Sequence, residues 1–215
     1  MNTDTAIIDD IKQLKTLNNN ITHLSFVWNF NQKVKYASNK ITHLSFGQNF
    51  NQKIKLSKNI THLTFGRRFN QQIIIPQNVT YLTFGDYFNR QIIISRNITH
   101  IKFGFCFNKQ IIIPQNVTHL TFGNQFNRQI IIPHNVIQLK FGYCFNKKIQ
   151  LSQNITHLNI GYYFNHKIFL HNSIIYLIFG DVYDDIKYLS YETLQLHKKF
   201  LKNTIISNHI KIIFK

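Results

Sequence analysis

The stretch NVTHLTFGNQFNRQIIIP, Asn116 to Pro133, is one copy of a unit that recurs along most of the chain. In its first half, Leu120 and Phe122 alternate with polar residues, which favours a strand with one buried face. Its second half, QIIIP, is short and β-branched, and Pro133 ends it. A unit of this length with two extended passes is typical of one coil in a stacked solenoid.

Two columns of residues define the repeat. The first is a Phe spaced by 19 residues after one step of 20, with Ile160 in the remaining place: Phe26, Phe46, Phe65, Phe84, Phe103, Phe122, Phe141 and Phe179. The second is the pair Phe-Asn, in which the Asn residues are Asn31, Asn51, Asn70, Asn89, Asn108, Asn127, Asn146 and Asn165. Eight repeats are clear, and in a degenerate ninth Tyr183-Asp184 replaces Phe-Asn.

The sequence therefore predicts a mainly β solenoid of about nine 19-residue coils, with two short strands in each coil. We expect the solenoid to occupy residues 19–180. Residues 1–18 are predicted to form a helical cap, because Ile7, Ile11, Leu14 and Leu17 lie at helical spacing. Residues 181–215 are predicted to form a second cap, with a helix over SYETLQLHKKFLKN and a strand over HIKIIFK.

Within each coil the pattern also predicts which side chains are buried. In the quoted copy the inward residues are Val117, Leu120, Phe122, Phe126, Ile130 and Ile132. Gly123 is expected to permit a sharp turn. The Asn of each Phe-Asn pair follows a buried ring at a turn, where backbone groups have no ladder partner, so we expect its side chain to satisfy them.

The columns THLTFG, FN and IP, at Thr118–Gly123, Phe126-Asn127 and Ile132-Pro133, resemble the FNIP repeat, a leucine-rich-repeat-like unit. That family is familiar from social amoebae and from large DNA viruses that infect amoebae. The resemblance implies a leucine-rich-repeat-like solenoid that serves as a protein-interaction scaffold and not as a catalyst. Asn127 falls two places later than the ladder Asn of leucine-rich repeats, so their coil geometry does not transfer in detail.

The charge of the chain is strongly positive, with 25 Lys and Arg against 8 Asp and Glu, a difference of 17. Between Asn20 and Gly180 there are 17 basic residues and one acid, Asp86. Such a field attracts polyanions, although Lys, Asn, Ile, Phe and Tyr share A/T-rich codons, so genomic composition is an equally good explanation. With one carboxylate in the repeats there is no acid/base pair, and we predict that the protein is not an enzyme and has no cofactor.

The outer face of the first strand is the first candidate surface. One residue per coil should point outward there: His23, His43, His62, Tyr81, His100, His119, Gln138, His157 and Tyr176. Neighbours would lie ~4.8 Å apart. A zinc site is not expected, because a straight ladder holds its ligands in parallel and a metal needs them to converge. We predict that this Thr/His face binds a partner protein and that the histidines are mostly neutral at pH 7.

The second candidate is an apolar patch on the opposite segment. The middle residue of that segment should face outward, and it is isoleucine in four successive coils: Ile74, Ile93, Ile112 and Ile131. If exposed, this patch is a surface for a partner or for self-association. The alternative is that a cap or the strand twist covers it.

The third candidate is a basic edge that follows the Phe-Asn column, formed by Arg90, Lys109, Arg128 and Lys147. Aromatic residues such as Tyr87, Phe105 and Tyr143 precede it in the loops. Cationic rows interleaved with rings bind single-stranded nucleic acid by neutralising phosphates and stacking on bases. Binding of nucleic acid or another polyanion along this edge is therefore the alternative function.

Several features bear on location and modification. No apolar run approaches the ~20 residues that span a membrane, and the N-terminus has acids where a secretion signal would have bases. Cys106 and Cys144 lie two coils apart, too far for a disulfide. We therefore predict a cytoplasmic protein, in the host cytoplasm if the chain is viral, with free thiols and no membrane partner. The Asn-[Ile/Val]-Thr triplets are interpreted as coil corners without glycans.

Overall fold

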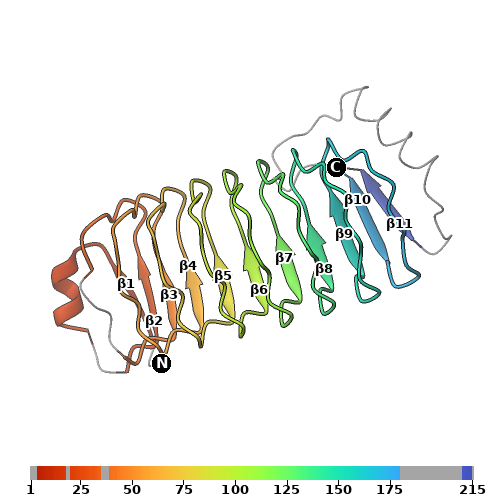
Figure 1. The fold of residues 1–215 in the computed structure, drawn as a ribbon. Helices are drawn as coiled ribbons and strands as arrows, with labels where there is room; N and C mark the ends of the chain where they lie inside the picture. Colours follow the sequence, from red (N-terminus) through yellow and green to blue (C-terminus); the bar gives the residue numbers. More distant parts are fainter. Residues whose placement is uncertain (1–3, 18–19, 35–38, 180–209, 215) are drawn as a thin grey trace.

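The computed structural model describes residues 4–17, 20–34, 39–179 and 210–214. Its strands form one parallel sheet in which the spatial order equals the chain order (Figure 1). The strands are β1 (Thr5–Ile8), β2 (His23–Phe26), β3 (His43–Ser45), β4 (His62–Thr64), β5 (Tyr81–Thr83), β6 (His100–Lys102), β7 (His119–Thr121), β8 (Gln138–Lys140), β9 (His157–Ile160), β10 (Tyr176–Phe179) and β11 (Lys211–Phe214).

The 19-residue period sets the register of the sheet. Equivalent residues pair from coil to coil, so Leu120 of β7 lies beside Ile101 of β6 and Leu139 of β8. Because a slip of one residue would turn every inward side chain to solvent, the burial of this column fixes the pairing. The six predicted inward residues of the quoted copy, from Val117 to Ile132, are all buried.

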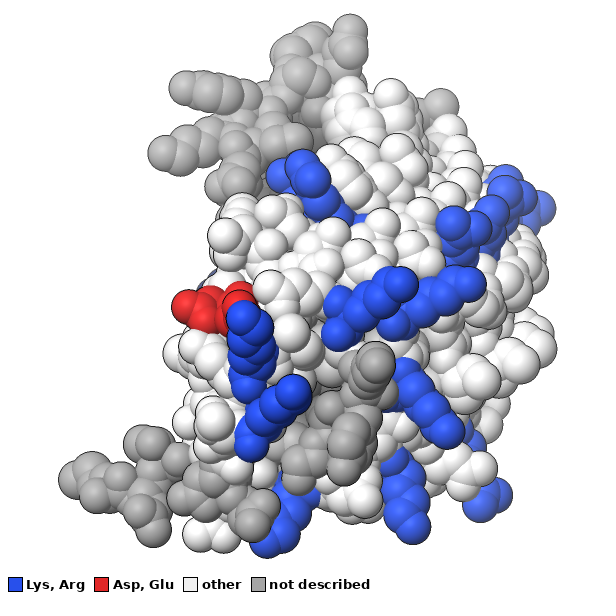
Figure 2. Space-filling view, turned by 90° about the vertical axis from the view of Figure 1, so that its left-hand side faces the viewer, with Lys and Arg blue, Asp and Glu red and all other residues white. Residues whose placement is uncertain are grey.

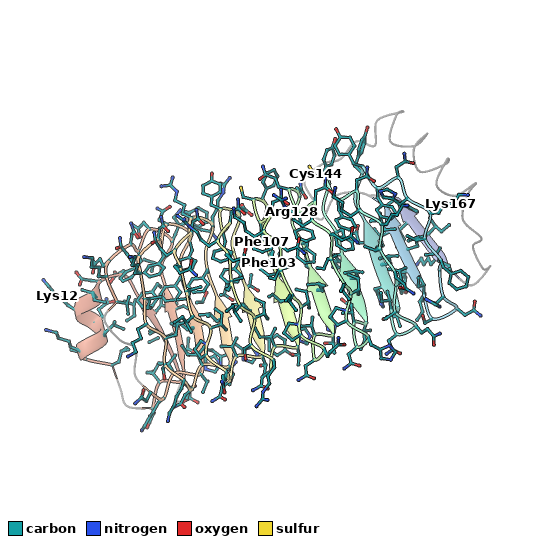
Figure 3. The ribbon with its side chains drawn as sticks, in the orientation of Figure 1. Lys12, Phe103, Phe107, Arg128, Cys144 and Lys167 are labelled. Carbon is teal, nitrogen blue, oxygen red and sulfur yellow. The ribbon has the colours of Figure 1, made fainter. Side chains whose placement is uncertain are left out.

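Two columns of stacked phenylalanines fill the interior. Phe103, directly after β6, and Phe107, from the following turn, have ring centroids 4.0 Å apart within one coil (Figure 3). Phe103 also stacks on Phe122 of the next coil at 5.4 Å, and Phe107 stacks on Phe126 at 6.1 Å. Every coil thus buries rings against its own partner and against both neighbours, which makes stacking of coils the source of the core.

The spacing between coils widens with distance from the strand face. The outward rings on that face stack at 4.0 to 4.3 Å. Successive rings of the first Phe column are 5.1 to 5.8 Å apart, and those of the Phe-Asn column are 6.0 to 6.3 Å apart. The coils therefore fan out away from the sheet, and the strand face is the concave side of the array.

The prediction of two strands per coil was wrong. The second segment is extended, with Ile73 and Ile75 buried and Ile74 exposed between them, but it forms no strand. A parallel ladder needs ~4.8 Å between strands, and the fanning of the coils opens this side. Side-chain amides cross the gap instead: Gln72, Gln91, Gln110 and Gln129 each donate Nε2 to a backbone carbonyl of the next coil.

The asparagine column has the structural role that the sequence predicted. The Oδ1 atom of Asn108 accepts a hydrogen bond from the backbone N–H of Asn127 at 3.1 Å, and Asn89 does the same for Asn108 at 3.0 Å. The bonds run without a break from Asn31 to Asn165. The amide side chain spans the widened spacing at a turn where backbone groups cannot reach one another.

The N-terminal cap differs from the predicted helix. Residues Thr5–Ile8 form β1, which pairs in parallel with β2, and only Ile11–Lys15 are helical, as the 3-10 helix η1. Asp10 caps η1 by accepting from the backbone N–H of Lys12. The helical period was misleading because Ile7 points outward while Ile8 enters the core, an alternation that suits an added strand.

At the other end, β11 confirms the strand predicted over HIKIIFK and pairs with β10. The helix predicted over SYETLQLHKKFLKN lies outside the described residues. Strands are thus added to both ends of the repeat array, so the sheet extends beyond the coils that the repeat pattern identifies.

The glycine column is required by close approach and not by a special turn. A Cβ atom on Gly104 would lie 2.2 Å from the carbonyl oxygen of Gly85, and one on Gly123 would lie 2.1 Å from that of Gly104. No residue larger than glycine fits there unless the backbone of the neighbouring coil moves. The predicted turn is present, because the N–H of Phe126 donates to the carbonyl of Gly123. Gly123 needs no left-handed φ for it, so the close approach and not the turn excludes a side chain.

The asparagine ladder predicts the effect of Asn108→Ala. Removing Oδ1 leaves the Asn127 N–H without its acceptor, so we expect a loss of about 1–3 kcal/mol in the free energy of unfolding. Asn108→Asp keeps an acceptor oxygen and should lose much less. Urea unfolding followed by circular dichroism measures both, and equal stability of Asn108→Ala and the parent would contradict the role of the ladder.

The glycine column predicts a second effect on stability. Gly104→Ala forces two coils apart, and we expect a cost of about 3 kcal/mol or more, because overpacking is relieved only by a backbone shift. Gln125→Ala, an exposed change in a neighbouring loop, is the control and should be nearly neutral. Thermal melts of the two variants test this, and a normal melting temperature for Gly104→Ala would exclude the close approach.

Candidate interaction surface on the strand face

A continuous row of stacked rings lies on the concave face. His23, His43, His62, Tyr81, His100 and His119 follow one another with centroid distances of 4.0 to 4.3 Å and interplanar angles of 10 to 19°. Gln138 interrupts the row, and His157 and Tyr176 continue it at 4.8 Å. The structure therefore brings the predicted column together as an ordered stack and not as independent side chains.

A threonine fixes each histidine ring. The hydroxyl of Thr118 lies 2.9 Å from Nδ1 of His119, and it also donates to the backbone carbonyl of Thr99 in the preceding coil at 3.2 Å. The same pair of contacts holds His43, His62, His100 and His157 in their coils. The polar neighbour of each histidine thus orients the ring and links two coils.

These contacts favour one position for the proton of the neutral imidazole. A hydroxyl has one proton, and a carbonyl can only accept, so a threonine that donates to the carbonyl must accept from Nδ1–H. The proton is assigned to Nδ1 by this network, which leaves the lone pair on Nε2. The row therefore presents Nε2 atoms as hydrogen-bond acceptors at successive coils.

The environment keeps four histidines of the row neutral. Burial lowers the pKa of His43, His62, His100 and His119, and the positive charge of neighbouring histidines lowers the pKa further. Lys140 adds to the lowering of the His119 pKa. At neutral pH these imidazoles are uncharged, and they gain protons only below the ordinary range of histidine.

A shallow hollow of about 200 Å³ runs across β5 to β8 beside the rings. On one side it is bordered by Tyr81, His100 and His119, and on the other by Lys102 and Lys140. The face thus combines flat rings, neutral acceptors and two cations, a composition suited to recognition of a surface.

Two residues of the predicted basic edge, Arg90 and Arg128, are held along the asparagine ladder. Arg90 and Arg128 each donate Nε to a carbonyl of the preceding coil, at Asn70 and Asn108, over 3.0 and 3.1 Å. Figure 3 labels Arg128 on this edge. Among the loop aromatics, Tyr143 stacks on Tyr162 at 4.8 Å.

The apolar patch is fully outside. The side chains of Ile74, Ile93, Ile112 and Ile131 are 86 to 90% exposed, so neither a cap nor strand twist covers them. At one end of the patch a groove of about 800 Å³ is lined by Lys53, Lys55, Lys58, Ile54, Leu56 and Ile74. Exposed isoleucines and an adjoining groove make this a surface distinct from the strand face.

The remaining sequence features have structural explanations. Cys106 and Cys144 are not joined in a disulfide, and burial raises the pKa of Cys106. In the Asn-[Ile/Val]-Thr triplets, Asn97, Asn116 and Asn154 donate Nδ2 to carbonyls of the preceding coil. The atom that would carry a glycan therefore already bonds the corner of one coil to the next.

Two elements of the surface were missed from the sequence. The bridging glutamines recur in four successive coils, and the threonines that orient the histidines recur in most coils, so the period contained the signal. Their roles depend on reach across the inter-coil gap, which residue type alone does not give.

The described part of the chain bears on metal binding and on membrane insertion. There, no three His, Cys, Asp or Glu side chains are grouped in a way that could hold a metal ion. Nor do these residues include a helix with the length and apolar character needed to traverse a bilayer.

Comparisons with known proteins agree with this architecture. The FNIP Repeat family model matches residues 50–75, 74–106 and 107–144. Among solved structures, the chain is similar to "CroV588 a novel circular LRR protein structure", with a TM-score of 0.52 and 29% identity. The alignment covers 94% of this chain and 38% of that one, so the chain spans well under half the length of its structural relative. The curated proteins provide no match.

The repeat columns, the parallel sheet with one strand per coil and both comparisons point to one assignment. The chain carries three tandem FNIP repeats within residues 50–144, in a solenoid similar to a leucine-rich-repeat structure.

Proposed function

We propose that the protein is a non-enzymatic interaction scaffold that binds a partner protein through its concave Thr/His face. The observation that carries this proposal is the unbroken stack of six rings from His23 to His119, oriented by threonines. Such a stack presents a large, rigid and amphipathic surface at little cost in side-chain entropy, which is the quality that makes aromatic residues effective at interfaces.

The tautomer of the row defines the chemistry of the partner. Nε2 acceptors at neutral pH pair with hydrogen-bond donors, and the surrounding positive charge disfavours donors that are themselves cationic. The partner therefore presents uncharged donors, such as amides and hydroxyls, to the rings, with carboxylates placed to meet Lys102 and Lys140.

Polyanion binding along the basic edge is the second candidate. It is favoured by the alignment of Arg90 and Arg128 through the same backbone contact, two coils apart. In Figure 2, which looks at the N-terminal end, Lys and Arg occur at many points of the surface and Asp and Glu at one. A salt series separates the two functions, because polyanion binding falls steeply with salt.

Substitutions on the strand face test the first proposal. The partner is first identified by native copurification and mass spectrometry, and its affinity is then measured by calorimetry. The triple change His62→Gln, His100→Gln and His119→Gln should weaken binding by about tenfold or more, because it removes the rings at the centre of the row. Gln already occupies this column at position 138, so the coils should still stack.

Arg90→Gln with Arg128→Gln is the matched control for that measurement. It should leave partner affinity within about twofold, since rim charges contribute little to affinity. The opposite pattern, with the arginine pair essential and the histidines dispensable, would replace the first proposal by the second.

The neutral histidine row also predicts a dependence of stability on pH. The pKa of these groups is lower in the folded chain than the ordinary value of ~6.5, so the unfolded chain binds more protons between the two values. Stability present at neutral pH should therefore fall as the pH drops through 6.5. Melting temperatures between about pH 7.5 and 5 measure this.

In the same series, His62→Gln with His100→Gln should flatten the pH dependence, because two of the shifted groups are gone. His134→Gln, at an exposed position outside the row, should leave it unchanged. A parent protein whose melting temperature is constant over this range would show that the row is not held neutral.

A further inference from the structure

We propose that the face opposite the sheet is a peripheral membrane surface, on which the exposed isoleucines enter the lipid interface and adjacent lysines bind anionic headgroups. This surface consists of Ile74, Ile93, Ile112 and Ile131 together with the groove that adjoins Ile74. It is separate from the strand face, and the proposal departs from the prediction of no membrane partner.

The isoleucines form a regular line. They occupy the same place in four successive coils, and the Phe-Asn rings of those coils are 6.1 Å apart at each step. Buried isoleucines on either side hold each one outward: Ile92 and Ile94 anchor the segment around Ile93 in the core. The side chains therefore project together from a rigid support, and no rearrangement is needed to expose them.

The charges that surround the line are cationic. In the extended second segment, Arg90 and Arg96 lie three residues before and after Ile93, roughly 10 Å away along the chain at ~3.3 Å per residue. Lys109 and Arg128 stand three residues before Ile112 and Ile131. The single acid in residues 39–179, Asp86, pairs with Arg67 in a loop that precedes the Phe-Asn turn.

The groove supplies a place for headgroups at the end of the line. Ile54 and Leu56 are only partly buried, unlike Ile73 and Ile75 in the next coil, so an apolar wall is accessible there. Lys53, Lys55 and Lys58 stand around it, all three exposed. An apolar wall with three ammonium groups at its rim matches the boundary between acyl chains and anionic headgroups.

The same charges argue against a second copy as the occupant. Pressing two such faces together would bring the cationic rows of both molecules into one interface with no carboxylates between them, and like charges at an interface are repulsive. An anionic bilayer presents an apolar layer beneath a negative one, which complements both the isoleucines and the cations.

Cosedimentation with vesicles tests the proposal on the full chain. The parent should bind vesicles of phosphatidylcholine with about 30% phosphatidylserine and not vesicles of phosphatidylcholine alone. Ile93→Ser with Ile112→Ser should weaken binding to the anionic vesicles by about tenfold or more, because burial of two large apolar side chains is lost. Ile93→Leu with Ile112→Leu is the matched control and should bind as the parent does.

The charge contribution is tested separately. Lys55→Gln with Lys58→Gln should reduce binding to anionic vesicles by about 30-fold, at ~1 kcal/mol for each lysine near the surface. Lys102→Gln with Lys140→Gln removes the same charge from the strand face and should have a much smaller effect. All the substituted side chains are at least partly exposed to solvent. Circular dichroism with thermal melts verifies that the variants fold.

The outcomes are distinct. Failure of the parent to bind anionic vesicles overturns the proposal, as does binding that is insensitive to the isoleucine change. Sedimentation equilibrium without lipid identifies the alternative: a dimer that Ile93→Ser with Ile112→Ser dissociates, in a protein that ignores vesicles, would make a second copy the occupant. The triple histidine change of the strand face should retain vesicle binding, so the two proposed surfaces can fail independently.

Discussion

The hydrogen-bonded ladder of parallel strands is the constraint on which the rest of the structure depends. It holds the coils ~4.8 Å apart at the sheet, while the two phenylalanine columns of the core repeat at 5.1 to 6.3 Å. Both spacings are satisfied only when the coils fan out. Neighbouring coils are therefore closest at the sheet and farthest apart on the opposite side. Glycine is then obligatory where coils are closest, and amide side chains are needed where they are farthest apart.

The difference in coil spacing between the two sides explains what the sequence could and could not predict. The columns of Leu120, Phe122 and Phe126 identified the core and the register, because periodicity reports which side chains face inward. The exposure of Ile112 followed from the same alternation. The second segment was mistaken for a strand because the alternation of buried and exposed residues indicates only that the backbone is extended. A hydrogen-bonded ladder also requires that the segments of neighbouring coils lie close enough together. The N-terminal segment failed for a related reason: Ile7 and Ile11 share a helical spacing, but β2 offered a free strand edge to Thr5–Ile8.

The chemistry of the candidate strand face could also be predicted only in part from the sequence. The histidine column was visible in the sequence, and its neutrality was expected from the proximity of like groups. The position of the imidazole proton was not expected from the sequence. It depends on a threonine hydroxyl that donates to the preceding coil while it accepts from the ring. A repeat of residue types therefore predicts a repeated surface, but the hydrogen-bonding character of that surface depends on contacts between coils.

The two faces of the solenoid are suited to different partners because curvature affects them in opposite ways. On the concave face the coils draw outward side chains together, so rings reach stacking distance and shield one another from water, which lowers the pKa of the histidines. On the opposite face the coils spread, so isoleucines and cations stand apart with solvent between them. A rigid partner surface complements a compressed row of rings, whereas separated apolar side chains contact a deformable phase without having to fit its shape. In the two proposals, the same repeat therefore produces a strand face that selects a partner by its shape and an opposite face that selects a lipid surface by its composition.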